Sequence, residues 1–260
     1  MSTFMGKSWF DGPALDVSAA GVSFVSQARF DGCVALSHWP REEVERLLPA
    51  ELELATNASP TPDLHPVVFV FGDLSDGAVI VGRVTLPLGI AYQEFAVAVP
   101  FVKYRRGRQL RTYVPRMYSS YRPAVWSGNA NYGLAKRPAT MRWQGPFFVI
   151  TGEDGALLLH IGLERGDGWT PASRCELPNF AAMREILAMQ VLGRKASGAY
   201  VCCYFGWDFG QALVRTADSC VSIDGPVANG IGSRRCPDVA GGTFELRGAI
   251  WRLSWPAPCR

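Results

Sequence analysis

The chain of 260 residues contains 48% hydrophobic and 19% charged residues, an ordinary balance for a globular protein with an ample core. Its formal net charge of +3 is too small to indicate a nucleic-acid-binding protein. The chain has no run of about 18 apolar residues, so no transmembrane helix is predicted. The N-terminus lacks the apolar stretch of a signal peptide. We therefore expect a cytoplasmic protein with neither a nucleic-acid partner nor a membrane partner.

The N-terminal part predicts a lead-in segment, an extended segment and a short helix. Residues 1–20 are expected to precede a single domain of residues 21–260. Residues 21–36 are typical of extended chain, with an interruption near Asp31-Gly32. A short amphipathic helix is expected from Pro40 to Leu48, because Pro40 suits a first helical turn, acidic residues follow it and Pro49 ends it.

Most of the remaining chain predicts β-strands. Runs rich in β-branched and aromatic residues, separated by turn signals, occupy residues 67–71, 78–86, 90–102, 110–117, 123–127, 140–150, 156–163, 199–205, 213–223 and 243–255. Asn179–Leu192 predicts a second helix, and residues 224–242 predict a loop. The pattern predicts an α+β fold that is mainly β, a curled antiparallel sheet forming a barrel-like core with a few helices outside.

Cysteines, histidines and one basic run suggest no site of their own. The seven cysteines have no regular spacing and no CxxC pair, so we expect reduced, mostly buried thiols and no disulfide framework. No metal site is expected, because the three histidines are isolated and lack metal-ligand spacing. The basic run between Arg105 and Arg111 is interpreted as a solvated hairpin tip, with a phosphate or nucleic-acid patch as the alternative.

Lys136 stands in a nearly uncharged, aromatic-rich segment from Ser127 to Pro138. Of the 26 Lys and Arg residues only four are lysines, so most positive charge in this chain is arginine. Arginine cannot serve as an amine nucleophile because its guanidinium stays protonated, whereas lysine can where burial or a neighbouring cation favours the free amine. Lys136 is therefore a candidate nucleophile, and a surface lysine is the structural alternative.

Three sequence features follow one another along the chain. A leucine-proline segment from Arg46 to Leu54 comes after the first helix, and a predicted strand holds Tyr92-Gln93-Glu94. Arg122-Pro-Ala-Val-Trp-Ser-Gly128 then leads, after eight residues, to Lys136-Arg137. This order and spacing resemble the acetoacetate decarboxylase family over about residues 25–255, most specifically over 92–139. The resemblance implies that family's fold and a homo-oligomer.

The resemblance also implies roles for individual residues. Lys136 aligns with the lysine that forms a Schiff base, and Glu94 aligns with a glutamate beside the amine that would act as general acid or base. Arg137 replaces a second lysine and would add positive charge, while Arg29 lies near a family arginine and would hold a substrate carboxylate. The alternatives are a solvent-facing Arg137, since strand residues alternate faces, and a structural ion pair for Arg29. The residues expected to line the substrate pocket are Tyr92, Tyr132, Leu134, Phe147 and Phe148.

The chain departs from the family pattern at three places. Gly128-Asn129-Ala130 replaces Gly-Arg-Glu, Ala135 replaces a proline, and Val70 stands where a second glutamate is expected. The lysine that imine chemistry requires is retained.

Two functions are compatible with this sequence. The first is a lyase that forms a Schiff base between Lys136 and a small-molecule oxo acid, followed by decarboxylation or by aldol, dehydration or cyclisation chemistry. It needs no cofactor, because the protonated imine is itself the electron sink. The alternative is a non-catalytic β-barrel that binds an apolar small molecule.

Overall fold

The computed structural model describes residues 22–56, 61–177, 179–224 and 234–259. The predicted lead-in of residues 1–20 lies outside them, as does the middle of the loop predicted for residues 224–242. The longest described helix has 11 residues, and no helix in these ranges is long and apolar enough to cross a membrane.

Strands make up most of the described chain. The helices are α1 (Arg41–Glu45), α2 (Arg122–Tyr132) and α3 (Phe180–Ala188), with a 3₁₀ turn at Ala172–Arg174. The first nine strands are β1 (Phe24–Pro40), β2 (Leu52–Leu54), β3 (Leu64–Val81), β4 (Val84–Tyr104), β5 (Arg111–Ser119), β6 (Lys136–Pro138), β7 (Thr140–Gln144), β8 (Phe147–Thr151) and β9 (Leu157–Arg165). The others are β10 (Thr170–Pro171), β11 (Val191–Arg194), β12 (Tyr200–Cys203), β13 (Phe205–Asp208), β14 (Leu213–Ile223), β15 (Arg234–Pro237), β16 (Thr243–Ser254) and β17 (Ala257–Pro258).

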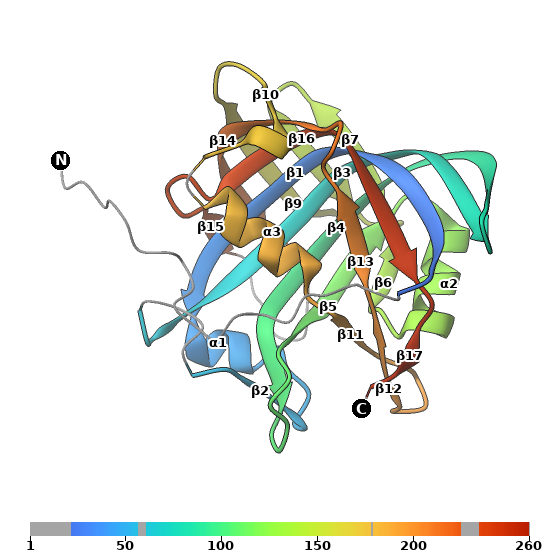
Figure 1. Cartoon of the computed structure of the whole chain (residues 1–260). Helices are drawn as coiled ribbons and strands as arrows, with labels where there is room; N and C mark the ends of the chain where they lie inside the picture. The colour runs from blue at the N-terminus through green and yellow to red at the C-terminus, as the bar shows by residue number, and fades with distance from the viewer. Residues whose placement is uncertain (1–21, 57–60, 178, 225–233, 260) are drawn as a thin grey trace.

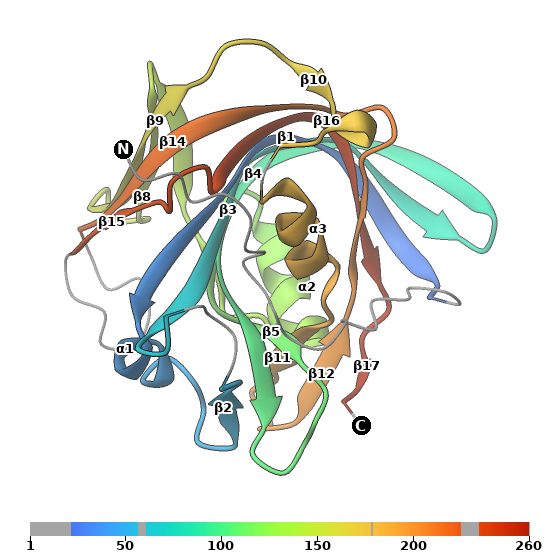
Figure 2. The same cartoon turned by 60° about the vertical axis from the view of Figure 1, so that its left-hand side comes forward.

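The strands form one large, curled and mostly antiparallel sheet. Its centre is the series β16–β1–β3–β4–β5, which continues from β16 through β14 to β9, β8 and β7. On the other side, β6 and β11 pair in parallel with β5. Figure 2 shows the sheet arching over α3, which lies in its hollow. The predicted mainly β fold, with a curled antiparallel sheet and few helices, is confirmed. The helices were expected outside the sheet, but α3 packs inside its hollow, because Phe180, Met183 and Ile186 give it an apolar side that joins the core.

Successive side chains of the central strands belong alternately to two hydrophobic cores, one on each face of the sheet. On β4, Phe95, Val97 and Val99 belong to the core that also holds residues of α1 and β7–β9. Between them, Ala96 and Ala98 face the second core, which includes the apolar side of α3. This division follows from the two-residue period of a strand. The face of β4 toward α3 therefore carries small side chains, which leaves space beneath the helix.

The strand predicted for residues 123–127 is wrong, because these residues belong to α2. Proline is favourable in a first helical turn, and Pro123 takes that place after the extended Tyr121. The helix ends at Gly133, whose φ of 62° is a left-handed conformation that glycine adopts without strain. A short run of Val and Trp had suggested a strand, but the local cap signals decided the conformation.

Two other predicted boundaries also differ from the structure. The helix predicted for Asn179–Leu192 is α3, which ends at Ala188. Residues 191–194 form β11 because β5 and β12 offer hydrogen-bonding partners there. Residues 234–237, predicted as loop, form β15 against β14. In both cases a partner strand distant in sequence determined the outcome.

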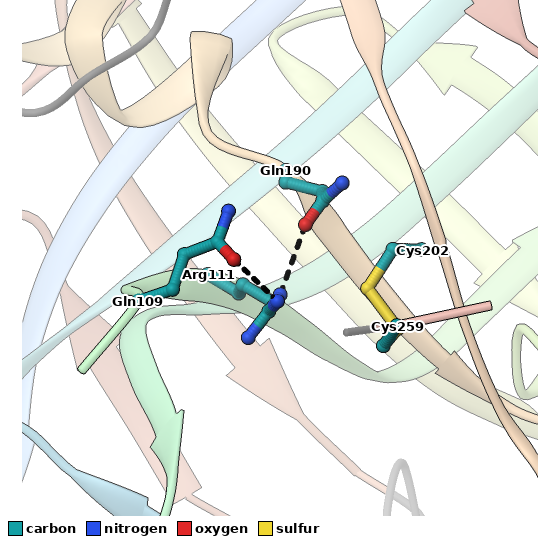
Figure 3. Close-up of a disulfide and its surroundings, with 5 residues drawn as sticks. All are labelled: Gln109, Arg111, Gln190, Cys202 and Cys259. Carbon is teal, nitrogen blue, oxygen red and sulfur yellow. Dashed lines mark hydrogen bonds between the residues drawn. A yellow bond between two sulfur atoms is a disulfide. The ribbon is translucent and has the colours of Figure 1, made fainter. Parts of the chain in front are cut away.

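The expectation that all cysteines are thiols is wrong for Cys202, which forms a disulfide with Cys259 (Figure 3). The two residues are 57 positions apart, and the pairing of β12 with β17 brings their Cα atoms to 5.2 Å. No local spacing could have indicated this bond. The neighbouring Cys203 is a buried thiol, as expected, and burial raises its pKa to about 12.

Arg111 corrects part of the interpretation of the basic run. Arg105, Arg106 and Arg108 are exposed near the β4–β5 turn, as a solvated hairpin tip predicts. Arg111 is instead 3% exposed and donates to the side chains of Gln190 (2.9 Å) and Gln109 (2.6 Å) beside the disulfide (Figure 3). This arginine is a buried structural residue at the start of β5, between β4 and β11.

Buried His65 should make stability depend on pH. Its Nε2 contacts the carbonyl oxygen of Pro100 at 2.9 Å, its Nδ1 has no hydrogen-bond partner in the described part of the chain, and burial lowers its pKa from 6.5 to about 4. Unfolding restores proton binding, so stability is full above pH 6.5 and falls as the pH drops toward 4. We expect a loss of about 2 kcal/mol between pH 7 and pH 5 in urea unfolding, and a smaller loss in His65→Leu. An equal loss in both proteins would contradict this assignment.

Candidate active site

Lys136 and Glu94 form a buried ion pair on one face of the sheet. The lysine Nζ donates to the glutamate Oε1 at 2.5 Å, and the two side chains are 7% and 11% exposed. Both residues are positioned by β5, where Lys136 pairs with Met117 and Glu94 pairs with Ser119. Two segments 42 residues apart thus place an amine and a carboxylate in direct contact.

The segment after α2 fixes the backbone of the lysine. The Asn129 side chain donates to the carbonyl oxygen of Lys136 (2.8 Å) and accepts from its backbone N–H (2.9 Å). The N–H of Leu134 also bonds to the carbonyl of Gly128 at 3.1 Å, which closes the turn after the helix. Asn129 was noted in the sequence only as a departure from the family pattern. The structure shows it as the residue that positions the lysine backbone.

Gly128 leaves room for the lysine side chain. A Cβ atom at this position would lie 3.2 Å from Cε and 3.6 Å from Nζ of Lys136. The distance to Cε is tighter than an ordinary van der Waals contact, and Glu94 packs against the other side of the lysine side chain. The requirement for glycine here therefore comes from the lysine side chain, because no left-handed backbone conformation is involved.

A cavity of about 290 Å³ opens at this ion pair. Its walls come from the β3–β4 hairpin, α2, β1, β13 and β16, and Figure 1 shows that hairpin and α2 on the same side of the sheet. The apolar lining includes Ala78, Val79, Leu88, Ile90, Leu134, Phe205, Trp251 and Leu253. Among the described residues that line it, only Lys136 and Glu94 carry a charge. The site is thus a mainly apolar pocket with one amine–carboxylate pair.

Two predicted pocket tyrosines do line this cavity. Tyr92 packs against Tyr121, with ring centroids 5.6 Å apart, and burial followed by the Glu94 charge raises the pKa of its phenol. Burial raises the pKa of Tyr132 to about 12. Both phenols therefore remain protonated at neutral pH, as neutral polar groups in the wall.

Other predicted site residues lie elsewhere. Arg29 points to the opposite side of β1 from Ala28, is exposed, and pairs with Asp31 at 3.1 Å. Arg137 is exposed on β6, where the alternation of strand residues turns it away from Lys136. Neither arginine lines the cavity, so the structure brings neither of them to the amine.

The predicted apolar wall is correct in part. Leu134 lines the cavity, but Phe148 is buried in the other core and Phe147 is exposed. Phe205 and Trp251 take the place of these two phenylalanines. They come from β13 and β16, more than 60 residues after the lysine, and no motif near them identified them in the sequence.

No family model matches the chain, and no curated protein matches its sequence. Solved structures do match in fold. MppR, an enduracididine biosynthesis enzyme complexed with the condensation product of pyruvate and imidazole 4-carboxaldehyde, has a TM-score of 0.60 at 9% identity, over 93% of this chain and 92% of that one. Acetoacetate decarboxylase from Legionella pneumophila has a TM-score of 0.57 at 11% identity, over 100% and 98% of the chains.

A third solved structure, an acetoacetate decarboxylase-like enzyme from Sphingomonas wittichii, has a TM-score of 0.56 at 12% identity, over 91% and 93% of the chains. The chain therefore has the acetoacetate decarboxylase-like fold. The fold that the sequence resemblance implied is confirmed.

Proposed function

We propose that this protein is an enzyme that forms an imine between Lys136 and a carbonyl substrate. The observation that carries the proposal is the buried contact of 2.5 Å between Lys136 Nζ and Glu94 in the wall of a mainly apolar cavity. A buried ion pair is costly to desolvate and contributes little net stability, so its presence at the wall of a pocket favours a chemical role. The enzymes that share the fold support the same class of function.

The contact gives the lysine a route to its nucleophilic form. Moving one proton from Nζ to Oε1 of Glu94 yields a free amine and a carboxylic acid, with no change in net charge. Nζ then attacks the carbonyl carbon, and the acid protonates the oxygen to give a carbinolamine. Loss of water leaves a protonated imine beside the Glu94 carboxylate, so the charges are balanced at the end of the step.

Decarboxylation of a β-oxo acid is the reaction that the pocket favours most. Arg29 and Arg137 lie outside the cavity, and the described lining offers no cation besides Lys136 to hold a substrate carboxylate. An apolar wall desolvates such a carboxylate, and the neighbouring Glu94 charge repels it. Its departure as carbon dioxide moves the bonding electrons into the imine and gives an enamine. Protonation and hydrolysis then return the ketone and the lysine.

Aldol condensation followed by dehydration is the second candidate reaction. It uses the same imine, but an α-proton is lost in place of carbon dioxide, and the enamine carbon attacks an aldehyde. The solved structures with this fold include MppR complexed with pyruvate and with a condensation product of pyruvate, which supports this alternative.

Borohydride trapping tests the proposal. The protein is incubated with acetoacetate, pyruvate, longer oxo acids and simple ketones, reduced with borohydride, and its intact mass is measured. We expect a mass increase equal to the carbonyl compound, or its decarboxylated ketone, minus one oxygen. Glu53→Gln is the control, because it removes the partner of the half-exposed Lys103 (2.9 Å) and should leave the adduct unchanged. No adduct with any compound would favour the non-covalent binding protein.

A further inference from the structure

A second cavity of about 70 Å³ lies deeper in the protein, between α3 and the sheet. Nearly all of the side chains that line this inner cavity are apolar, among them Val68, Leu74, Val114, Ile186, Leu187 and Met189. Its volume is well above what one water molecule needs. The cavity therefore suits an apolar group.

The inner cavity continues from the pocket at Lys136. Glu94, Phe205 and Trp251 line both spaces. The rings of Phe205 and Trp251 are stacked, with centroids 5.5 Å apart, and contribute to the lining of both spaces. A substrate bound as an imine at Lys136 would thus have its carbonyl carbon at the junction of the two spaces.

One face of β4 connects them. Tyr92 and Glu94 line the outer pocket, while Glu94, Ala96 and Ala98 line the inner cavity, as the alternation of strand residues requires. Val70 on β3 pairs with Ala96 and adds an apolar side chain at the position where the family pattern led us to expect a glutamate. The space beyond Glu94 exists because the residues there are small and apolar.

Thr112 is the one polar residue that β5 contributes to the lining of this cavity. Its side chain is 5% exposed, and its Oγ1 has no hydrogen-bond partner among the described residues. A buried hydroxyl without a partner is destabilising, because it has lost its hydrogen bonds to water and gained none in the protein. A hydroxyl retained at that cost beside an internal cavity indicates a bound partner that completes its hydrogen bond.

We propose that the inner cavity binds an apolar arm of the substrate, and that Thr112 hydrogen-bonds a polar group near the end of that arm. Thr112 and Met117, the pairing partner of Lys136, both line the β5 side of this cavity. The substrate class is therefore a medium-chain oxo acid with a distal hydroxyl or carbonyl group. The inference rests on the proposed imine function and adds the part of the substrate that determines specificity.

The test measures borohydride trapping rates for acetoacetate, 3-oxooctanoate and an 8-hydroxy-3-oxooctanoate probe. We expect the wild-type protein to react with the eight-carbon acids at least tenfold faster than with acetoacetate, since a buried methylene group contributes about 10-fold or more to specificity. Ala98→Leu, which fills the inner cavity, should lower this ratio at least fivefold. Ala181→Leu, the same substitution at an exposed position of α3, should leave the ratio unchanged.

Thr112→Val tests the polar end of the arm. It also tests the inner cavity in the event that Ala98→Leu does not fold. It should reduce the preference for the hydroxylated acid over the plain acid, and it should raise the melting temperature because the unpartnered hydroxyl is gone. Adducts that form at equal rates for all chain lengths would overturn the inference and leave the imine function intact. No adduct with any compound would overturn both.

Discussion

Lys136→Arg is expected to eliminate the borohydride adduct and to reduce turnover of any carbonyl substrate by more than about 1,000-fold. Arginine keeps the positive charge beside Glu94 but cannot release a nucleophilic amine. The fold should be retained, because the guanidinium of the new arginine is also a cation and can pair with Glu94 in place of the ammonium. The measurements are intact mass after trapping, turnover by ketone release, and circular dichroism of the variant.

Two further variants separate the chemical role of the lysine from its structural role. Lys103→Arg changes the lysine of a similar but half-exposed Lys–Glu pair and should keep full activity. Lys136→Met removes the cation and leaves Glu94 buried without its partner, so we expect a loss of about 3–5 kcal/mol in unfolding free energy. Turnover by Lys136→Arg at more than a tenth of the wild-type rate would show that the amine is not the nucleophile.

Glu94→Gln is expected to slow imine formation by about 100- to 10,000-fold. The amide has nearly the same shape and still offers an oxygen to Lys136 Nζ, but it cannot take up the lysine proton. The amine must then lose its proton to the solvent. The trapping rate of this variant should therefore be low, because no carboxylate in contact with the amine accepts its proton.

The matched control is Glu53→Gln, which removes the carboxylate of the half-exposed pair with Lys103 and should leave the trapping rate within about twofold of wild type. Unfolding in urea gives the stability of both variants, so that slow trapping is not confused with loss of structure. A Glu94→Gln protein that forms the imine at the wild-type rate would remove Glu94 from the mechanism.

The sequence identified the part of the candidate site that depends on local order along the chain. Lys136 and Glu94 belong to short motifs with characteristic spacing, and the structure brings them into contact. The mainly β architecture was also predictable, because alternating runs and turn residues are local signals. The helix α2 was missed because five apolar and small residues suggested a strand, while the signals that favoured a helix were Pro123 and the distant Gly133.

The features that the sequence did not predict all depend on contacts between distant segments. The disulfide joins Cys202 to Cys259 through the β12–β17 pairing, and the pocket wall of Phe205 and Trp251 depends on the β13–β16 pairing. Arg29 was placed near the site by alignment, but a one-residue shift in strand register exchanges the two faces of a sheet. Its exposed position on β1 is the result of that register.

The most direct test of the account is to locate the reduced adduct in the wild-type protein. The protein is trapped with an oxo acid that gives a mass increase, digested, and its lysine-containing peptides are sequenced by mass spectrometry. The account predicts that the modification lies on Lys136 alone among the four lysines. A modification on Lys103 or Lys195 with Lys136 unmodified would contradict it, because the buried contact with Glu94 would then have no part in the chemistry.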